Sequence, residues 1–334
     1  MFRRVVFVVI SLVIIAGAGW LALKRSDISY AALETVYMSD ASQFLTGEDG
    51  VKLHYRDQGN PKGQPIVLVH GFAASLHTWE PLVTELKDDY RLISLDLPSH
   101  GLSRSPIPAS STGMASFETA LSGLVEDLKL DDFVLVGSSM GGNLAWRYAL
   151  ENDDQLKGLV LVGAAGWPVE ASSDDSSFVF QLLENPIARR LLKDIDTSML
   201  MSSALKNSFF DETFVTDAMV ERYAALMRAP GHREGILAIL AADETPATEE
   251  RLAELDTPTL VLHGTYDRLV PVESGEMFAA AIPDAQLVIY EETGHLPQEE
   301  KPYLMAQHLS EFIEGTLVPR EQDYSAGLTT GLQP

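Results

Sequence analysis

A series of short, continuous apolar runs is the feature of this sequence that most constrains its fold. Each run consists mostly of Val, Ile and Leu and is too short for a helix of ordinary length. Strands that are apolar at nearly every position are buried on both faces, as in a parallel sheet covered by helices. We therefore predict strands at 65–69, 91–95, 133–136, 159–162, 259–262 and 286–290.

Stretches of helical length separate these runs, and the alternation predicts an α/β fold. The expected architecture is a mostly parallel central sheet with helices on both faces. A first pair of strands, at 44–46 and 52–56, precedes it across a Gly-rich turn. Helices are expected at 79–87, 116–128, 140–151, 273–281 and 301–314.

The alternation fails between residues 167 and 256. This segment is too long for a loop and contains helical patterns rich in Phe and Met. We predict that 167–256 forms a helical cap on a core made of 42–166 and 257–315. Most bulky residues of the cap would form its own small core, and the others would line a pliable apolar substrate pocket.

The N-terminus differs from the rest of the chain in composition. Arg3 and Arg4 precede Val5–Leu23, an uncharged segment that is long enough for a membrane-spanning helix. This favours an uncleaved anchor within 1–25 over a cleavable signal peptide, for which Ala16–Ala18 would be the cleavage site. The basic N-terminus predicts a single-pass protein with a periplasmic or extracytoplasmic catalytic domain; cleavage would instead give a secreted protein.

Two further segments and the overall charge complete the outline. Residues 26–41 show little periodicity and are expected to form a linker, and 316–334 a mobile C-terminal tail. The net charge of −24 argues against a nucleic-acid partner. The chain has no cysteine, which excludes disulfides and a cysteine nucleophile. No metal-ligand spacing is present, and we expect no cofactor.

A Gly-x-Ser-x-Gly pattern within Gly137–Gly142 selects Ser139. It stands where the strand predicted at 133–136 ends and the helix predicted at 140–151 begins. A serine on such a sharp turn is held exposed, and the turn requires small neighbours. The helix N-terminus would also place partial positive charge beside a developing oxyanion. We therefore predict that Ser139 is a nucleophile.

His295 and Asp267 are the predicted base and acid that such a serine needs. His295 follows the strand predicted at 286–290, and Asp267 follows the one at 259–262. Sites in open α/β sheets collect beyond the carboxyl ends of strands. The order serine, acid, histidine is the one expected for hydrolases of this build.

The remaining polar residues at strand ends have other predicted roles. Asp96 precedes the serine in the chain, so we expect it to hold a loop by accepting backbone hydrogen bonds. An oxyanion hole needs two convergent N–H groups. The predicted donors are Met140, directly after the nucleophile, and Phe72, in the loop after residue 69. His70 is expected to brace that loop.

Together these motifs resemble the α/β-hydrolase superfamily over roughly residues 42–315. The resemblance is closest to its branch of serine esterases and lipases, C–C bond hydrolases, haloperoxidases and epoxide hydrolases. Ser99 stands where that branch usually has glycine, which bears on loop geometry. The matching segments are His70–Phe72, Asp96–Ser103, Gly137–Gly142, His263–Asp267 and Gly294–His295.

The resemblance implies acyl transfer without a cofactor. Ser139 would attack an ester carbonyl with His295 as base, and water would resolve the acyl-enzyme. We expect a carboxylesterase or lipase-like hydrolase of apolar acyl esters, which could be lipid-like.

Two alternatives remain open. A C–C bond hydrolase of dienone ring-cleavage products would use a basic cap residue such as Arg189, Arg190 or Arg222. Those enzymes usually have tryptophan where this chain has Leu296. The other alternative is a non-catalytic ligand-binding protein of the same fold.

Overall fold

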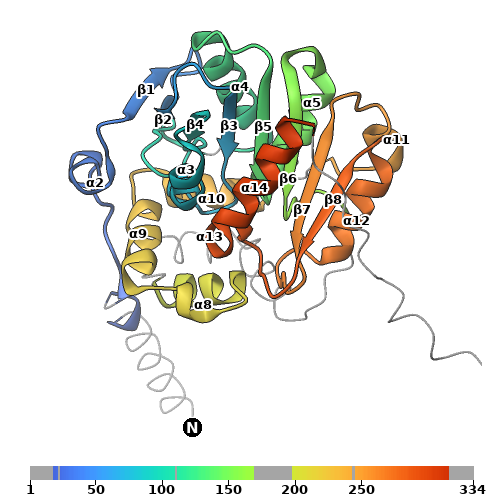
Figure 1. The fold of residues 1–334 in the computed structure, drawn as a ribbon. Coiled ribbons are helices and arrows are strands. Elements are labelled where there is room, and N and C mark those ends of the chain that lie inside the picture. The colour runs from blue at the N-terminus through green and yellow to red at the C-terminus, as the bar shows by residue number, and fades with distance from the viewer. Residues whose placement is uncertain (1–17, 22, 110, 169–197, 243–244, 316–334) are drawn as a thin grey trace, which may run out of the picture.

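The computed structural model describes residues 18–21, 23–109, 111–168, 198–242 and 245–315. Its centre is an eight-stranded sheet of order β1-β2-β4-β3-β5-β6-β7-β8 (Figure 1). β1 and β2 pair antiparallel at one edge, and every pair from β4 to β8 is parallel, as predicted. The strands are β1 Ser42–Thr46, β2 Lys52–Gly59, β3 Pro65–Val69, β4 Arg91–Leu95, β5 Phe133–Ser138, β6 Leu156–Val162, β7 Thr259–Gly264 and β8 Gln286–Tyr290.

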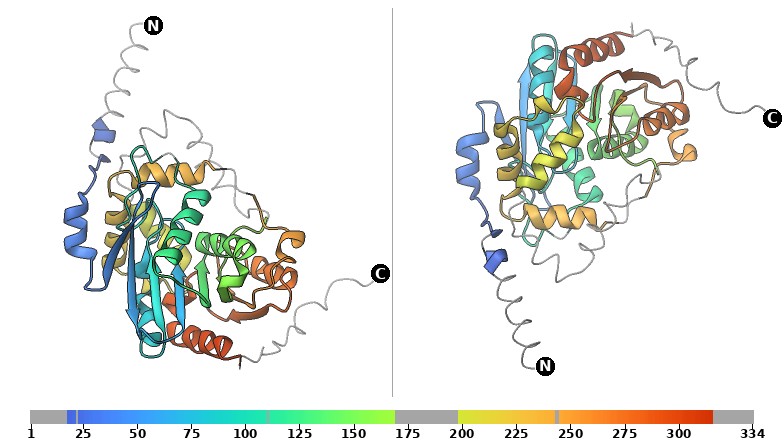
Figure 2. Two further views of the ribbon diagram at one scale, coloured as in Figure 1. Left: turned by 90° about the horizontal axis from the view of Figure 1, so that it is seen from above. Right: turned by 90° about the horizontal axis from the view of Figure 1, so that it is seen from below.

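Each parallel strand contributes side chains to two separate cores, one on each face of the sheet. On β3, Ile66 and Leu68 belong to the apolar cluster that includes residues of α3 and α14, whereas Val67 and Val69 belong to the cluster that includes residues of α4, α5 and α12. Because helices cover both faces, apolar residues are required at successive positions. Figure 2 shows the helices on the two sides of the sheet. These helices are α3 Glu80–Leu86, α4 Met114–Asp127, α5 Met140–Glu151, α12 Val272–Ala281 and α14 Pro302–Ile313.

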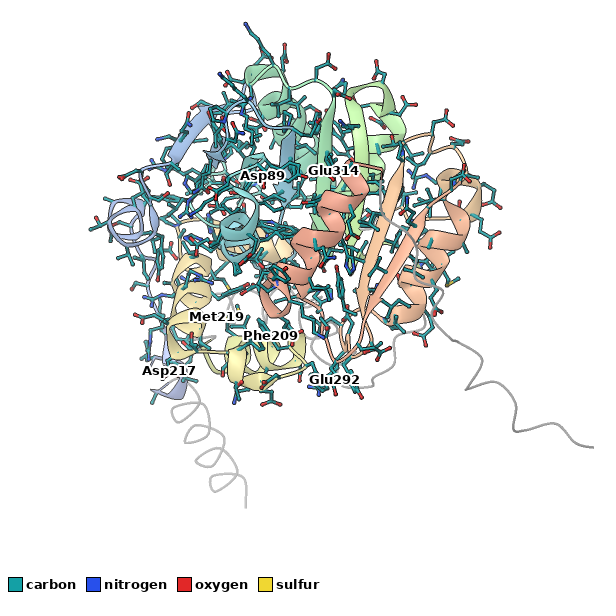
Figure 3. The ribbon with its side chains drawn as sticks, viewed as in Figure 1. Asp89, Phe209, Asp217, Met219, Glu292 and Glu314 are labelled. Atoms are coloured by element: carbon teal, nitrogen blue, oxygen red, sulfur yellow. The ribbon has the colours of Figure 1, made fainter. Side chains whose placement is uncertain are left out.

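Helices from the predicted cap segment lie over the carboxyl ends of the strands (Figure 1). They contribute to a small apolar core whose residues include Met201, Leu205, Phe209 and Tyr223, together with Leu296, the residue after His295. Figure 3 labels Phe209, which directly follows α8 (Ser198–Ser208). Residues 169–197 and 243–244 of the predicted cap lie outside the described residues. We call three helices the cap helices: α8 Ser198–Ser208, α9 Asp217–Met227 and α10 His232–Leu240.

Short elements complete the chain and carry several residues of the site. They are η1 Leu76–Trp79, η2 Asp153–Gln155, η3 Glu212–Phe214, α11 Glu249–Leu252 and α13 Pro297–Glu300.

The predicted membrane anchor requires correction. Residues 1–17 and 22 lie outside the described residues, and 18–21 and 23 are helical. Among the described residues, no helix has the length and apolar character needed to cross a membrane. The prediction of a single-pass, membrane-anchored protein with an extracytoplasmic catalytic domain is therefore withdrawn. The predicted tail, 316–334, also lies outside the described residues.

Residues 26–41, expected to form a linker, pack against the cap helices instead. Helix α2 (Tyr30–Tyr37) buries Leu33 in a cluster with Leu226 of α9. Arg228 donates two hydrogen bonds to the carbonyl oxygen of Ser26, at 3.0 and 2.8 Å. An eight-residue helix that buries a single leucine has too few apolar positions to show a period in the sequence.

Candidate active site

Ser139 occupies the turn between β5 and α5 with a φ of 54°, in the left-handed region that serine rarely adopts. Such a residue carries on the order of 1–3 kcal/mol of strain and persists only where its surroundings hold it. Its N–H donates to the carbonyl oxygen of Val162 at 2.9 Å, and its carbonyl oxygen accepts from the N–H of Ala165 at 3.0 Å. The end of β6 and the loop after it therefore hold the turn in place.

Two glycines give this turn the room it needs. A Cβ atom on Gly137 would lie 2.2 Å from the carbonyl oxygen of Gly141, and one on Gly141 would lie 2.4 Å from that of Val69. Both clashes are with backbone, which cannot move aside without shifting α5 or β3. The glycines of the motif are thus required by the close packing of helix on strand.

Asp267 and His295 form a buried pair beyond the ends of β7 and β8. The Nδ1 atom of His295 lies 2.6 Å from Oδ2 of Asp267. Because a carboxylate can only accept, Nδ1 donates and the lone pair remains on Nε2. The N–H groups of Leu269 and Val270 each donate to Oδ1 of Asp267 at 2.9 Å. These bonds fix the orientation of the carboxylate.

The charge of Asp267 is maintained although its side chain is fully buried. Burial acts to raise its pKa, but the attraction of His295 and hydrogen bonds from His263 and His295 hold the pKa below its usual range. His263 Nε2 lies 3.3 Å from Oδ2 of Asp267. His263, unassigned from the sequence, thus supports the carboxylate from a second side.

Ser139 and His295 line one pocket of about 420 Å³ beneath the cap helices. Its described lining includes no Lys, Arg, Asp or Glu. Met201 and Met227, from the Met-rich segment noted in the sequence, both contribute to it. The apolar part of the wall is made by Phe72, Ala73, Ala74, Met201, Ala204, Leu205, Met227, Leu269 and Leu296.

The loop that carries Phe72 runs directly against Ser139. A Cβ atom on Gly71 would lie 3.0 Å from Cβ of Ser139, so a side chain at 71 would crowd the serine. Met140 is the first residue of α5, and the N–H groups of a first helical turn have no acceptor within the helix. Met140 directly follows Ser139, and Phe72 follows the glycine that lies against it; their role as oxyanion donors stays a prediction.

His70 connects this loop to the loop after β4. Its Nδ1 donates to the carbonyl oxygen of Gly71 at 2.7 Å, and its Nε2 accepts from the N–H of Leu97 at 3.0 Å. Burial lowers the pKa of His70, which agrees with the neutral form that this pattern requires. The bracing role predicted for His70 matches these contacts.

Asp96 has the structural role predicted for it. Its carboxylate accepts from the N–H groups of Leu76 and Leu102, each at 2.8 Å, and lies 2.7 Å from Nδ1 of His54. Burial acts to raise its pKa, but the hydrogen bond and charge of His54 outweigh that effect and lower it. Asp96 thereby joins the loop after β4 to strand β2 and to the start of η1.

Ser99, the departure from the family pattern, has a φ of 63°. Its buried hydroxyl forms hydrogen bonds of 2.9 Å with the hydroxyls of Ser105 and Thr112. The left-handed backbone accounts for the glycine usual at this position, and the two hydrogen bonds offset the strain of a serine there.

A group of polar residues at one end of the pocket was not predicted from the sequence. Thr78, Ser138 and Gln298 line the cavity, and the buried Glu299 lies behind Thr78. Thr78 is more than two hundred residues from Gln298 and Glu299, so only the fold reveals the contact. The available signal was the position of Gln298 and Glu299, three and four residues after His295.

Glu300 links the cap to the loop of His295. Its carboxylate accepts from the N–H groups of Phe210 at 2.7 Å, Asp211 at 3.3 Å and Gly294 at 2.5 Å. The N–H of His295 itself donates to the carbonyl oxygen of Ser208 at 2.7 Å. The end of α8 therefore helps to position the histidine.

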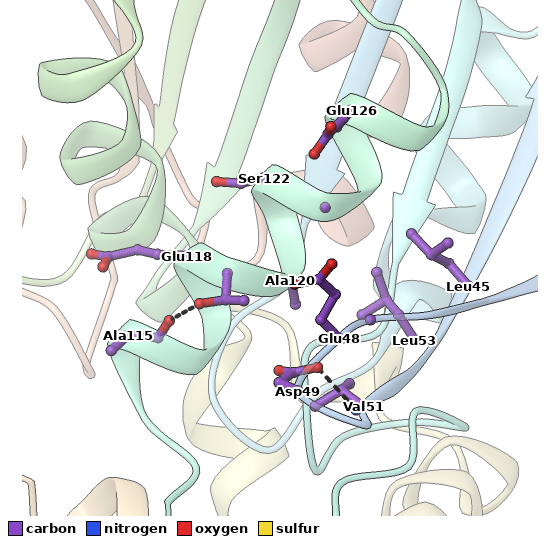
Figure 4. A pocket seen from close by; sticks show the side chains of 13 residues that line it. Leu45, Glu48, Asp49, Val51, Leu53, Ala115, Glu118, Ala120, Ser122 and Glu126 are labelled. Atoms are coloured by element: carbon purple, nitrogen blue, oxygen red, sulfur yellow. Dashed lines mark hydrogen bonds between the residues drawn. The ribbon is translucent and has the colours of Figure 1, made fainter.

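A second cavity, of about 590 Å³, lies between the β1–β2 turn and α4 (Figure 4). Carboxylates of Glu48, Asp49, Glu118 and Glu126 surround it, and none of the residues described above lines it. Within the part of the chain that the structure describes, no three or more His, Cys, Asp or Glu side chains are grouped to hold a metal ion.

The model of a protein family described as alpha/beta hydrolase fold matches residues 64–302. The chain belongs to this family. The match spans every strand of the parallel sheet and all three residues at the strand ends: Ser139, Asp267 and His295.

The similar proteins include ring-cleavage-product hydrolases and an esterase. The chain is 30% identical to 2-hydroxy-6-oxononadienedioate/2-hydroxy-6-oxononatrienedioate hydrolase 2 of Pseudomonas putida, over 80% of this chain and 94% of that protein. It is 29% identical to the uncharacterized hydrolase YugF of Bacillus subtilis, over 80% of this chain and 96% of that protein. The solved structure of a thermophilic esterase from Thermogutta terrifontis superposes with a TM-score of 0.67. Its sequence is 29% identical, and the match covers 83% of this chain and 99% of that one.

Proposed function

We propose that the protein is a serine hydrolase that cleaves carboxylic esters with apolar acyl groups. The observation that carries the proposal is the pocket shared by Ser139 and His295, whose described lining is uncharged and largely apolar. An apolar acyl chain gains about 25 cal/mol per Å² of buried surface in such a pocket. A carboxylate-bearing substrate would lose its hydration there without gaining a cation.

In the proposed mechanism Ser139 Oγ bonds to the ester carbonyl carbon while Nε2 of His295 takes the hydroxyl proton. Asp267, already bound to Nδ1, stabilises the imidazolium that forms. The carbonyl oxygen becomes an oxyanion that accepts hydrogen bonds from the N–H groups of Phe72 and Met140.

Collapse of this intermediate breaks the ester C–O bond, and the leaving alcohol takes the proton from His295. A water molecule then attacks the acyl-enzyme as His295 accepts its proton. Collapse of the second intermediate releases the carboxylic acid and returns the proton to Ser139.

A second candidate function is cleavage of a C–C bond in a dienone ring-cleavage product. The names of curated relatives support this reaction better than they support ester cleavage, because several are 2-hydroxy-6-oxononadienedioate hydrolases. Such a substrate is a dicarboxylate and needs a cation in the pocket. Arg222 is not among the described lining residues, and Arg189 and Arg190 lie outside the described residues.

A substrate comparison separates the two candidates. We expect kcat/KM for p-nitrophenyl esters, from acetate to long acyl chains, to exceed that for a 2-hydroxy-6-oxo-dienoate ring-cleavage product. Ser139→Ala should abolish ester turnover. The opposite preference would replace the ester proposal with the second candidate. Absence of both activities, with no reaction with a fluorophosphonate, would favour a non-catalytic binding protein.

A further inference from the structure

The loop after β3 places Gly71, Phe72 and Ala73 in the wall of the pocket that Ser139 also lines. Ala73 has a φ of 55°, which residues other than glycine adopt rarely and at a cost in strain. Its N–H donates to a side chain, Nε2 of His100, at 3.2 Å. His100 lies in the loop after β4, so its ring connects two loops at the pocket.

The partners of His100 determine which of its ring nitrogens carries the proton. Nδ1 lies 3.0 Å from the carbonyl oxygen of Pro98. A carbonyl oxygen can only accept, so Nδ1 carries the proton and Nε2 keeps a lone pair for the N–H of Ala73. Burial lowers the pKa of His100, which keeps the ring neutral and the acceptor available.

His70 and His100 hold the two peptide groups that flank Phe72. Nδ1 of His70 donates to the carbonyl oxygen of Gly71, in the peptide before Phe72. Nε2 of His100 accepts from the N–H of Ala73, in the peptide after it. Both peptides are trans, so the C=O and N–H of each point in opposite directions. The N–H of Phe72 therefore points away from the ring of His70.

Among the described residues, the N–H of Phe72 has no acceptor. The next two N–H groups do have one: that of Ala73 donates to His100, and that of Ala74 to the carbonyl oxygen of Gly71. The peptide of the unpaired N–H begins at Gly71, where a Cβ atom would lie 3.6 Å from Oγ of Ser139. The loop thus keeps one donor unpaired close to the nucleophile.

We propose that His100 is a positioning residue: by accepting the N–H of Ala73, it fixes the peptide after Phe72 and so holds the N–H of Phe72 in place to donate to the oxyanion. This inference rests on the proposed function, in which that N–H is one of two donors. A donor held in advance costs no reorganisation when the negative charge develops. His100 is not among the described lining residues, so it should affect kcat more than substrate binding.

His100→Leu is the primary test, because it removes the acceptor and keeps an apolar side chain in a buried position. Loss of a whole oxyanion donor lowers kcat by about 10² to 10³. A donor that is misdirected should cost less, so we expect kcat for p-nitrophenyl butyrate to fall by about ten- to a hundredfold. KM should change by less than about threefold, since the pocket wall is retained.

A transition-state analogue distinguishes this effect from a general loss of structure. With an alkyl trifluoromethyl ketone, Oγ of Ser139 bonds to the carbonyl carbon, its proton passes to His295 and the carbonyl oxygen becomes an oxyanion. The matched trifluoromethyl alcohol forms no oxyanion. His100→Leu should weaken inhibition by the ketone by the same factor as kcat/KM and leave inhibition by the alcohol unchanged.

Two further variants test the acceptor itself. His100→Gln should retain more activity than His100→Leu, because its amide oxygen can accept the N–H of Ala73. The matched control is His308→Leu, which removes another buried ring with a hydrogen bond, 3.0 Å from the hydroxyl of Tyr290, and should keep the wild-type kcat. His100→Met replaces His100→Leu if the latter does not fold.

Three results overturn the inference and leave the proposed function intact. They are a wild-type kcat in folded His100→Leu, equal weakening of the ketone and the alcohol, and a folded His100→Gln protein no more active than His100→Leu. A wild-type protein that cleaves no ester would instead refute the proposed function and the inference with it.

Discussion

The pairs Asp96–His54 and Asp267–His295 are built in nearly the same way. Each aspartate follows a strand of the sheet, has a fully buried side chain and accepts two backbone N–H bonds. Each binds Nδ1 of its histidine, at 2.7 Å for His54 and 2.6 Å for His295. In each pair the histidine lowers the pKa of the carboxylate against the opposing effect of burial.

The pairs differ in what the second nitrogen of the histidine meets. Nε2 of His54 lies 2.9 Å from the hydroxyl of Ser42 on β1, which closes the network inside the protein. His295 instead lines the pocket together with Ser139. A buried aspartate–histidine pair is therefore not by itself a catalytic feature, because only the environment of Nε2 distinguishes a structural pair from a proposed catalytic one.

Glu299 shows what a buried carboxylate does without a histidine. Burial, only partly offset by the hydrogen bond from Thr78 and the charge of Arg222, raises its pKa to about 7. The paired aspartates remain charged, whereas Glu299 is poised to take up a proton.

The largest effect is expected for Ser139→Ala. Loss of the nucleophile should reduce kcat for a p-nitrophenyl ester by about 10⁴ to 10⁶ without unfolding the protein. Ser122→Ala, on the exposed side of α4, is the matched control and should leave kcat unchanged. A Ser139→Ala protein with wild-type kcat would refute the proposal that Asp267 and His295 serve a catalytic serine.

Replacing each aspartate by asparagine should have different effects on kcat and on stability. Asp267→Asn should reduce kcat by about 10⁴, because His295 loses the acceptor that fixes its tautomer. Asp96→Asn should change kcat by less than about tenfold but lower the free energy of unfolding by about 2–4 kcal/mol. Urea unfolding and kcat of both variants check this, and a folded but inactive Asp96→Asn protein would contradict it.

Replacement of Glu299 should change how stability depends on pH. Its pKa rises from 4.5 in the unfolded chain to about 7 in the folded protein, so the folded protein binds the extra proton between these values. Its contribution to the free energy of unfolding therefore falls as pH rises from 4.5 to 7, and is flat above.

Glu299→Gln should remove that decline. The difference in free energy of unfolding between the variant and the wild type should therefore be up to about 3 kcal/mol more in favour of the variant at pH 8 than at pH 5. The charged neighbours Arg222, Glu80 and Glu300 stay in place in this variant. Urea unfolding at pH 5, 6, 7 and 8 measures the difference from wild type, and a constant difference would show that Glu299 does not titrate in this range.

The smallest effect is expected for Ser42→Ala, which frees Nε2 of His54. The loss of one hydrogen bond should lower the free energy of unfolding by about 1 kcal/mol. Activity should be unchanged, since freeing Nε2 without a pocket and a serine creates no base. A change in kcat would show that the Asp96–His54 pair affects the Asp267–His295 pair.

The sequence predicted those parts of the molecule that follow from local pattern and chain order. Uniformly apolar runs identified the parallel strands because both faces of the sheet are covered. Ser139, Asp267 and His295 followed from their positions after strands, since the carboxyl ends of parallel strands meet at one edge. Asp96 also follows a strand, and only its position before the serine in the chain distinguished it from the predicted acid.

Contacts between distant segments could not be predicted in the same way. The Thr78–Gln298–Glu299 cluster depends on how η1 packs against α13, which no local period records. The docking of α2 depends on Leu33 and on backbone carbonyl oxygens, which carry no residue signature. The anchor prediction relied on the length of one apolar run and the charges beside it, and it required correction, as did the expectation of a linker at 26–41.

Labelling with a fluorophosphonate, followed by mass spectrometry of the modified peptide, tests the central claim most directly. The account predicts one phosphonyl group per chain, on Ser139, in the wild type and in Asp96→Asn, and strongly slowed labelling in Asp267→Asn. Labelling of another residue, no labelling of the folded wild type, or equal rates in the two aspartate variants would contradict it.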